Sequence, residues 1–216
     1  MNRIRLTSEG AASTFEVAPA PFKEAVRWRS KHEDRKPSPI FMTQDAYLGI
    51  YAHSLGDMSH EVGGMLIGQV MQTPSGTTYS VIEAQLPAHH VEHSSIHLTF
   101  TSDTLTELLT RREDEYPHWQ VIGWYHTHPR LSVFMSSHDV WLHTNFFPEV
   151  WHVALVVDPI AENAGFFHYT NRPQRYLHPQ AYVGFNELCG ENPSIVAWGN
   201  LTRDDTQQHG FDEPDT

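Results

Sequence analysis

Cysteine is almost absent from this chain, in which Cys189 is the only one. No intrachain disulfide can therefore form, and a zinc site built from several thiolates is excluded. Long apolar runs are missing as well, because none approaches the ~20 residues that a membrane-spanning helix needs. The first residues also contain no hydrophobic signal core. We therefore expect a soluble, cytoplasmic protein with no membrane partner.

Positive charge is also scarce. The chain has 14 lysines and arginines against 26 aspartates and glutamates, which gives a formal net charge of -12. Binding of nucleic acid requires clustered lysine and arginine, so nucleic acid is excluded as a partner. The acidity suits a basic protein partner, but solubility explains it equally well. The length of 216 residues fits one domain, and no internal repeat is present.

Three segments of the chain differ in composition. Residues 1–38 mix charges, alanines and prolines, and a short helix is expected over residues 22–31. This N-terminal extension is either a docking or self-association arm or a loosely ordered terminus. Residues 39–200 have the pattern of a folded domain. Residues 201–216 are polar and acidic, which predicts a disordered tail.

The folded segment combines strand and helix signals. A strand over residues 40–42 leads to Thr43, the expected cap of a helix with a buried apolar stripe. The members of that stripe are Tyr47, Leu48, Tyr51, Leu55 and Met58. Strands over residues 62–71 and 78–86 are joined by Thr73-Pro74-Ser75-Gly76, a hairpin signal. Further helices are expected over residues 104–114 and 136–147, and further strands over residues 120–126, 150–157 and 165–169. These elements predict an α/β (α+β) fold, a mixed and mainly antiparallel sheet flanked by helices.

The strand that ends at Pro129 contains two histidines, His126 and His128. Because side chains alternate along a strand, both imidazoles point the same way and can bind one ion. The helix that begins near Ser136 carries Asp139 in its first turn, so strand, loop and helix start converge on one point. Two imidazoles and one carboxylate, with no obvious fourth ligand, are typical of an open catalytic zinc site.

Each of these residues also has an ordinary explanation. Ser136 and Asp139 have the spacing of a helix cap and its third-position carboxylate, which resembles a capping box. A His-x-His sequence arises easily by chance in a chain with 16 histidines. Glu61, which precedes an apolar run, alone reads as a solvated carboxylate at a strand end. The residues indicate a metal site only when they are taken together and in order.

The combined pattern resembles the JAMM/MPN metallopeptidase family. That pattern consists of a remote glutamate, His-x-His-Pro, six residues, and Ser-x-x-Asp, and every element is present in this sequence. The segment Glu61-Val62-Gly63-Gly64-Met65-Leu66-Ile67-Gly68 is similar to the upstream glutamate segment, and Gly123-Trp124-Tyr125 to the residues before the histidines. By order of elements the match covers about residues 39–170. The compact size is similar to that of a prokaryotic or free-standing member of the family.

The resemblance implies a single MPN-like domain and assigns five residues. It implies a zinc ion held by His126, His128 and Asp139, with Glu61 as the group that transfers protons. Ser136 would steady the oxyanion of the transition state. The implied reaction is hydrolysis of the amide bond after the C-terminal glycine of ubiquitin or a ubiquitin-like protein, beside a separate conjugation machinery.

Two other functions remain open. One is a zinc peptidase that trims C-terminal extensions from ubiquitin-like or sulfur-carrier proteins, because the same zinc chemistry cuts several kinds of amide. The other is an MPN interaction scaffold, although the intact motif argues against it. Histidine and carboxylate ligands also accept divalent metals other than zinc.

Several residues outside the motif could also contribute to the site. The short polar segment over residues 87–100 lies where the family inserts a segment that shapes substrate access. Its histidines read either as a second metal site or as solvated side chains; they are His89, His90, His93 and His97. His143 either orients Asp139 or simply packs. Phe134 is expected beside the scissile bond, and Asp158 reads as a strand-ending turn and nothing more.

Overall fold

The computed structural model describes residues 15–32, 38–89, 92–94, 97–170, 176–204 and 211. Its sheet strands are β1 (Glu16–Val17), β2 (Ala25–Arg29), β3 (Ile40–Thr43), β4 (Gly63–Gln72), β5 (Thr78–Pro87), β8 (Gln120–Thr127), β9 (Val153–Asp158), β10 (Asn163–Thr170), β11 (Tyr176–Leu177), β12 (Phe185–Leu188) and β13 (Thr202–Asp204). They form one sheet in the order β11-β10-β9-β8-β4-β5-β3-β12-β2-β13, and β1 pairs with β4. The short strands β6 (Glu92–Ser94) and β7 (His97–Thr99) form a separate hairpin.

The sheet is mixed and mainly antiparallel, as the sequence predicted. The long β4–β5 hairpin and the β4–β8 pair are antiparallel at its centre. The β8–β9 pair is parallel, so the carboxyl ends of these two strands meet at the same edge of the sheet. His128 follows β8 at this edge and Asp158 ends β9 there.

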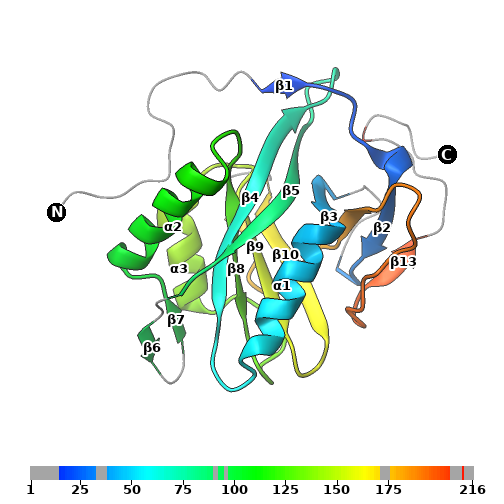
Figure 1. Cartoon of the computed structure of the whole chain (residues 1–216). Helices are drawn as coiled ribbons and strands as arrows, with labels where there is room; N and C mark the ends of the chain where they lie inside the picture. Colours follow the sequence, from blue (N-terminus) through cyan, green and yellow to red (C-terminus); the bar gives the residue numbers. More distant parts are fainter. Residues whose placement is uncertain are drawn as a thin grey trace.

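Three helices flank the sheet: α1 (Gln44–Gly56), α2 (Ser102–Glu115) and α3 (Ser137–Phe146). Successive residues of β8 contact different helices. The hydroxyl of Tyr125 lies 2.7 Å from Nδ1 of His53 on α1, whereas Nε1 of Trp124 donates a hydrogen bond of 3.1 Å to Nδ1 of His143 on α3. Side chains alternate along a strand, so α1 and α3 cover opposite faces of the sheet. Figure 1 shows α2 and α3 on the same side of β4 and β8 in this view, with α1 on the other side.

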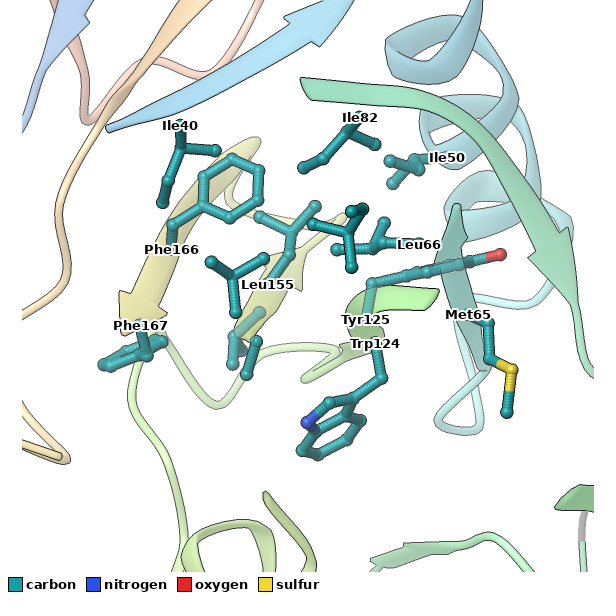
Figure 2. Packing of buried hydrophobic residues seen from close by; sticks show 14 of the residues in the cluster. Ile40, Ile50, Met65, Leu66, Ile82, Trp124, Tyr125, Leu155, Phe166 and Phe167 are labelled. Carbon is teal, nitrogen blue, oxygen red and sulfur yellow. The ribbon is translucent and has the colours of Figure 1, made fainter. Parts of the chain in front are cut away.

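The core lies on both faces of the central strands. Figure 2 shows Met65 and Trp124 on the side of the sheet away from Ile50 and Leu66. All four side chains are fully buried. Each face of β4 and β8 is therefore covered, which agrees with the nearly continuous apolar pattern of these strands.

The helix α1 begins where the sequence predicted, because the Thr43 hydroxyl accepts a hydrogen bond from the backbone N–H of Ala46. Its predicted apolar stripe is only partly correct. Tyr47 is buried and Tyr51 packs against the core, but Leu48, Leu55 and Met58 are 51%, 41% and 45% exposed. The helix instead buries a face made of Ala46, Tyr47, Ile50 and Ser54. Apolar periodicity did not identify this face because α1 carries apolar side chains on two sides.

The prediction of a helix over residues 22–31 is also wrong. Residues Phe22–Glu24 form a single 3-10 turn, and β2 follows. This segment pairs with β12 on one side and β13 on the other. Partner strands on both sides supply hydrogen bonds that a lone short helix lacks, so the tertiary context decides its structure.

The two terminal segments contribute to the same sheet. Within the expected tail, β13 pairs with β2, and Asp204 forms ion pairs with Arg27 at 3.6 Å and Arg29 at 3.5 Å. Phe211 packs against Phe22 with ring centroids 4.8 Å apart. The start of the expected disordered tail is therefore ordered. Residues 1–14, 33–37, 205–210 and 212–216 lie outside the described residues, so the predictions for those parts of the extension and tail remain predictions.

Candidate metal centre

The two motif histidines meet at the end of β8. Their Nε2 atoms lie 3.0 Å apart, and both residues are buried. The His126 ring stacks on Trp124, with centroids 4.5 Å apart and an interplanar angle of 10°. The ring of Phe134 lies 4.8 Å from that of His128. Aromatic neighbours therefore restrict both imidazoles and keep the two nitrogens directed at one point.

Asp139 reaches the same point from the first turn of α3. Its Oδ2 atom lies 3.4 Å from Nε2 of His126 and 3.6 Å from Nε2 of His128. Burial alone would raise the pKa of this carboxyl. The neighbouring His126 and hydrogen bonds from both histidines and Ser136 outweigh burial and hold the pKa of Asp139 far below its usual range. The carboxyl group is therefore ionised, as a metal ligand must be.

The three ligand atoms fit a tetrahedral metal ion. Bonds of about 2.0–2.1 Å at tetrahedral angles place two ligand atoms about 3.3 Å apart. The separations of 3.0, 3.4 and 3.6 Å bracket that value. Among the described residues, His126, His128 and Asp139 are the group of possible ligands whose atoms lie close enough together to hold a metal ion. Three protein ligands leave a position open for water or substrate.

Glu61 lies beside this group. Its Oε1 atom is 3.8 Å from Nε2 of His128, and its side chain is 11% exposed. The residue precedes β4. The backbone N–H and the carbonyl of Val62, next to it, both form hydrogen bonds with Thr127. The Thr127 hydroxyl accepts a hydrogen bond of 2.9 Å from the Val62 N–H, and the Thr127 N–H donates one of 2.8 Å to the Val62 carbonyl. Glu61 is thereby held beside the group formed by His126, His128 and Asp139.

The role of Thr127 was not predicted from the sequence. It is the middle residue of His126-Thr127-His128, and strand alternation directs its side chain away from the two imidazoles. Thr127 is completely buried, and its two hydrogen bonds to Val62 attach the end of β8 to the residue next to Glu61. The only signal in the sequence was a hydroxyl-bearing residue between two ligands.

Ser136 is both a helix cap and a neighbour of the ligands. Its Oγ atom accepts a hydrogen bond of 3.2 Å from the Asp139 N–H, and its own N–H donates one of 2.6 Å to Oδ2 of Asp139. The capping box that the sequence allowed is therefore present. The ordinary explanation and the metal-site explanation do not compete, because the cap brings Ser136 and Asp139 to the ligand group.

A comparison with known protein families identifies the chain. The profile described as JAB1/Mov34/MPN/PAD-1 ubiquitin protease matches residues 38–148, slightly more than half of the chain. The chain belongs to this family. The resemblance to JAMM/MPN metallopeptidases that the motifs indicated is thus confirmed.

Among the curated relatives of this JAB/MPN protein, two carry names that state action on ubiquitin. The STAM-binding protein-like protein of Xenopus laevis is 27% identical over 147 residues, which cover 66% of this chain and 32% of that protein. Lys-63-specific deubiquitinase BRCC36 of Xenopus tropicalis is 33% identical over 107 residues, 47% of this chain and 39% of its own length. Ubiquitin carboxyl-terminal hydrolase RPN11 of Saccharomyces cerevisiae is 25% identical over 133 residues, 61% of this chain and 42% of its own. The chain spans less than half the length of each of these relatives.

In the part of the chain that the structure describes, the other histidines of this JAB/MPN protein are not part of the group formed by His126, His128 and Asp139. His143 is buried and accepts the N–H of Trp124, which supports the packing role for it. His89 is exposed and lies 3.2 Å from Glu107 on α2. His90 and the side chains of His93 and His97 lie outside the described residues, so the second metal site stays untested. None of the described helices is long and apolar enough to cross a membrane.

Proposed function

We propose that this JAB/MPN protein is a zinc-dependent isopeptidase that hydrolyses the amide bond after the C-terminal glycine of ubiquitin or a ubiquitin-like protein. The observation that carries the proposal is the convergence of three buried ligand atoms, 3.0–3.6 Å apart, with the Glu61 carboxylate 3.8 Å from one of them. A scaffold would not require a buried ligand group with a carboxylate placed outside it.

The proposed metal ligands are His126, His128 and Asp139. When bound, a zinc ion supplies Lewis acidity, which polarises a carbonyl and lowers the pKa of water to about 7. The protein must then move protons. In this proposal Glu61 accepts a proton from the attacking water and returns it to the departing lysine amine. Its position next to the ligands, rather than among them, supports this role.

Ser136 is proposed to stabilise negative charge on the scissile carbonyl oxygen. Its Oγ atom accepts the Asp139 N–H, and its side chain also hydrogen-bonds to the Asp139 carboxylate, so the hydroxyl would exchange that carboxylate for the substrate oxygen as its acceptor. A donor held close to the reacting carbonyl stabilises charge that develops only in the transition state. The capping-box hydrogen bonds with Asp139 would keep the Ser136 side chain beside the proposed ligands.

The family and the names of two relatives support the proposed substrate class. Two of them are named for action on ubiquitin, one as a deubiquitinase specific for a lysine linkage and one as a ubiquitin carboxyl-terminal hydrolase. An extended tail ending in small residues would bind along an exposed strand edge and thread past the metal. Protein partners of the conjugation machinery are part of the same proposal.

The experiment is a cleavage panel with zinc-loaded protein. Its substrates are ubiquitin dimers and ubiquitin-like proteins with either lysine-linked targets or linear C-terminal extensions. We expect cleavage after the terminal glycine of lysine-linked substrates, with loss of cleavage in Glu61→Gln and with a chelator. Cleavage of linear extensions alone would support the trimming peptidase. Absence of all cleavage by protein with stoichiometric zinc would support the scaffold.

A further inference from the structure

The loop between the ligand strand and α3 has an unusual backbone. Leu131 N–H donates to the His128 carbonyl at 3.1 Å, which closes a turn with Pro129 in its second position. Arg130 and Ser132 have φ angles of 66° and 76°. Residues other than glycine rarely adopt these values, because their Cβ crowds the backbone. Something outside the loop must hold it in this form.

The carboxylate of Asp158 holds the loop in this form through hydrogen bonds. Its Oδ1 atom accepts the N–H of Arg130 and its Oδ2 atom accepts the N–H of Ser132, each at 3.1 Å. Oδ1 also accepts the N–H groups of Ile160 and Ala161 at 3.1 Å. The residue is 2% exposed. One buried carboxylate therefore binds four backbone donors and joins the end of β9 to both left-handed residues of the loop.

The parallel pairing of β8 and β9 makes this contact possible. The His128 N–H donates to the Val157 carbonyl at 2.8 Å, so Asp158 is the next residue along β9 beside the loop. The far end of the loop is held as well, because the Met135 N–H donates to the Pro179 carbonyl at 2.8 Å. Both ends of the segment between the histidines and α3 are thus attached to the fold.

The loop carries two apolar side chains, and the backbone of one and the ring of the other contact His128. The ring of Phe134 lies against His128, with centroids 4.8 Å apart, and Leu131 is 51% exposed. We propose that Asp158 is a positioning residue whose carboxylate fixes this loop, so that Phe134 and Leu131 form the substrate-facing wall beside His128. The part of this proposal that concerns substrate rests on the proposed isopeptidase function, whereas the part that concerns the loop does not.

The test compares the wild type with Asp158→Asn in the full-length chain. The amide has the shape of the carboxylate, but its NH2 group cannot accept the N–H of Ser132. Hydrogen exchange of the Arg130 and Ser132 amides is expected to speed up about tenfold or more, with unchanged zinc content. On the lysine-linked substrate, KM is expected to rise about tenfold while kcat stays within about threefold, because the ligands and Glu61 are untouched.

A rescue variant and a control separate positioning from general stability. Ser132→Gly in the Asp158→Asn background removes the crowding at a φ of 76°, so it should restore most of the KM and of the exchange protection at Arg130. The control is Glu187→Gln, which alters another buried carboxylate that accepts several hydrogen bonds, including those of Trp28 and Gln44. It should leave KM and exchange in the loop unchanged.

The outcomes are distinct. Unchanged exchange at Arg130 and Ser132 in Asp158→Asn would overturn the assignment, as would faster exchange without a change in KM. Loss of zinc, or unfolding of both Asp158→Asn and the rescue variant, would also overturn it by assigning Asp158 to metal retention or to the whole fold. If the wild type cleaves no substrate, the proposed function and the substrate-facing wall fail together. The exchange data then still decide whether Asp158 holds the loop.

Discussion

The Oδ2 atom of Asp139 accepts the backbone N–H of Ser136 at 2.6 Å and lies 3.4 Å from Nε2 of His126. A single oxygen therefore belongs to the cap of α3 and to the group of ligand atoms. The start of the helix cannot move without moving the carboxylate. Because of this coupling, a substitution of Ser136 or Asp139 can change both the stability of the helix and the binding of the metal. Matched control variants are needed to separate the two effects.

Asp139→Ala should remove the metal. Loss of one of three ligands is expected to weaken zinc binding by more than about 100-fold, beyond the range seen when only an outer partner of a ligand is lost. Zinc content after dialysis measures the effect. The control is Asp103→Ala, which removes an exposed carboxylate from the first turn of α2. It should keep zinc, and retention of stoichiometric zinc by Asp139→Ala would refute the ligand assignment.

Ser136→Ala should lower kcat by about 100-fold with zinc retained, the order expected for loss of one donor to an oxyanion. It should also lower the free energy of unfolding by about 1 kcal/mol, because a helix cap is lost. Thr101→Ala is the matched control, since the Thr101 hydroxyl accepts the Thr104 N–H at the start of α2. Equal losses of stability with unequal losses of kcat would support the role of Ser136. Equal kcat in both variants would contradict it.

Thr127→Val should impair proton transfer without affecting metal binding. The change keeps the shape of the side chain but leaves the Val62 N–H without its acceptor, which costs about 1–3 kcal/mol of stability. Val62 is then held less firmly, and Glu61 beside it becomes less well positioned. We therefore expect kcat to fall about tenfold and the pH dependence of kcat to change. Thr127→Ser keeps the hydroxyl and should recover both. Zinc loss in Thr127→Val would show instead that the residue supports the ligands.

Stability should fall in mildly acidic solution because of His53. Burial lowers the pKa of this residue below 6.5, and the nearby His89 lowers it further. The unfolded state then binds more protons below pH 6.5, so the free energy of unfolding falls as the pH is lowered through that value. Chemical denaturation between about pH 8 and pH 5 measures the slope. His53→Gln should flatten it, and an unchanged slope would assign the pH dependence to other groups.

The local parts of the site could be predicted from the sequence because they depend on short spacings. Alternation along one strand places His126 and His128 on the same side, and three residues along one helix turn bring Ser136 to Asp139. The cap of α1 at Thr43 was equally local. Most elements of the sheet were predicted for the same reason, since apolar periodicity reports on the nearest residues of the chain.

Contacts between distant segments could not be predicted in this way. The N-terminal segment was expected to be helical, yet β12 and β13 lie on either side of Ala25–Arg29 and make it a strand. The exposed stripe of α1 has the same spacing as a buried one, and only the position of the sheet decides which face is covered. Glu61 was placed near the ligands by family resemblance, and its 3.8 Å approach to His128 depends on strand pairing.

The sequence by itself determined which chemical groups are present and how neighbouring ones are spaced, because backbone geometry converts short spacings into directions. Only the tertiary structure decided which contacts Thr127 and Asp158 make. In the sequence, Thr127 is the middle residue of a motif and Asp158 is an apparent turn residue. Their hydrogen bonds reach Val62 and the loop at Arg130 and Ser132. Such partners are far apart in the chain, and only the register and order of the strands bring them within hydrogen-bonding distance.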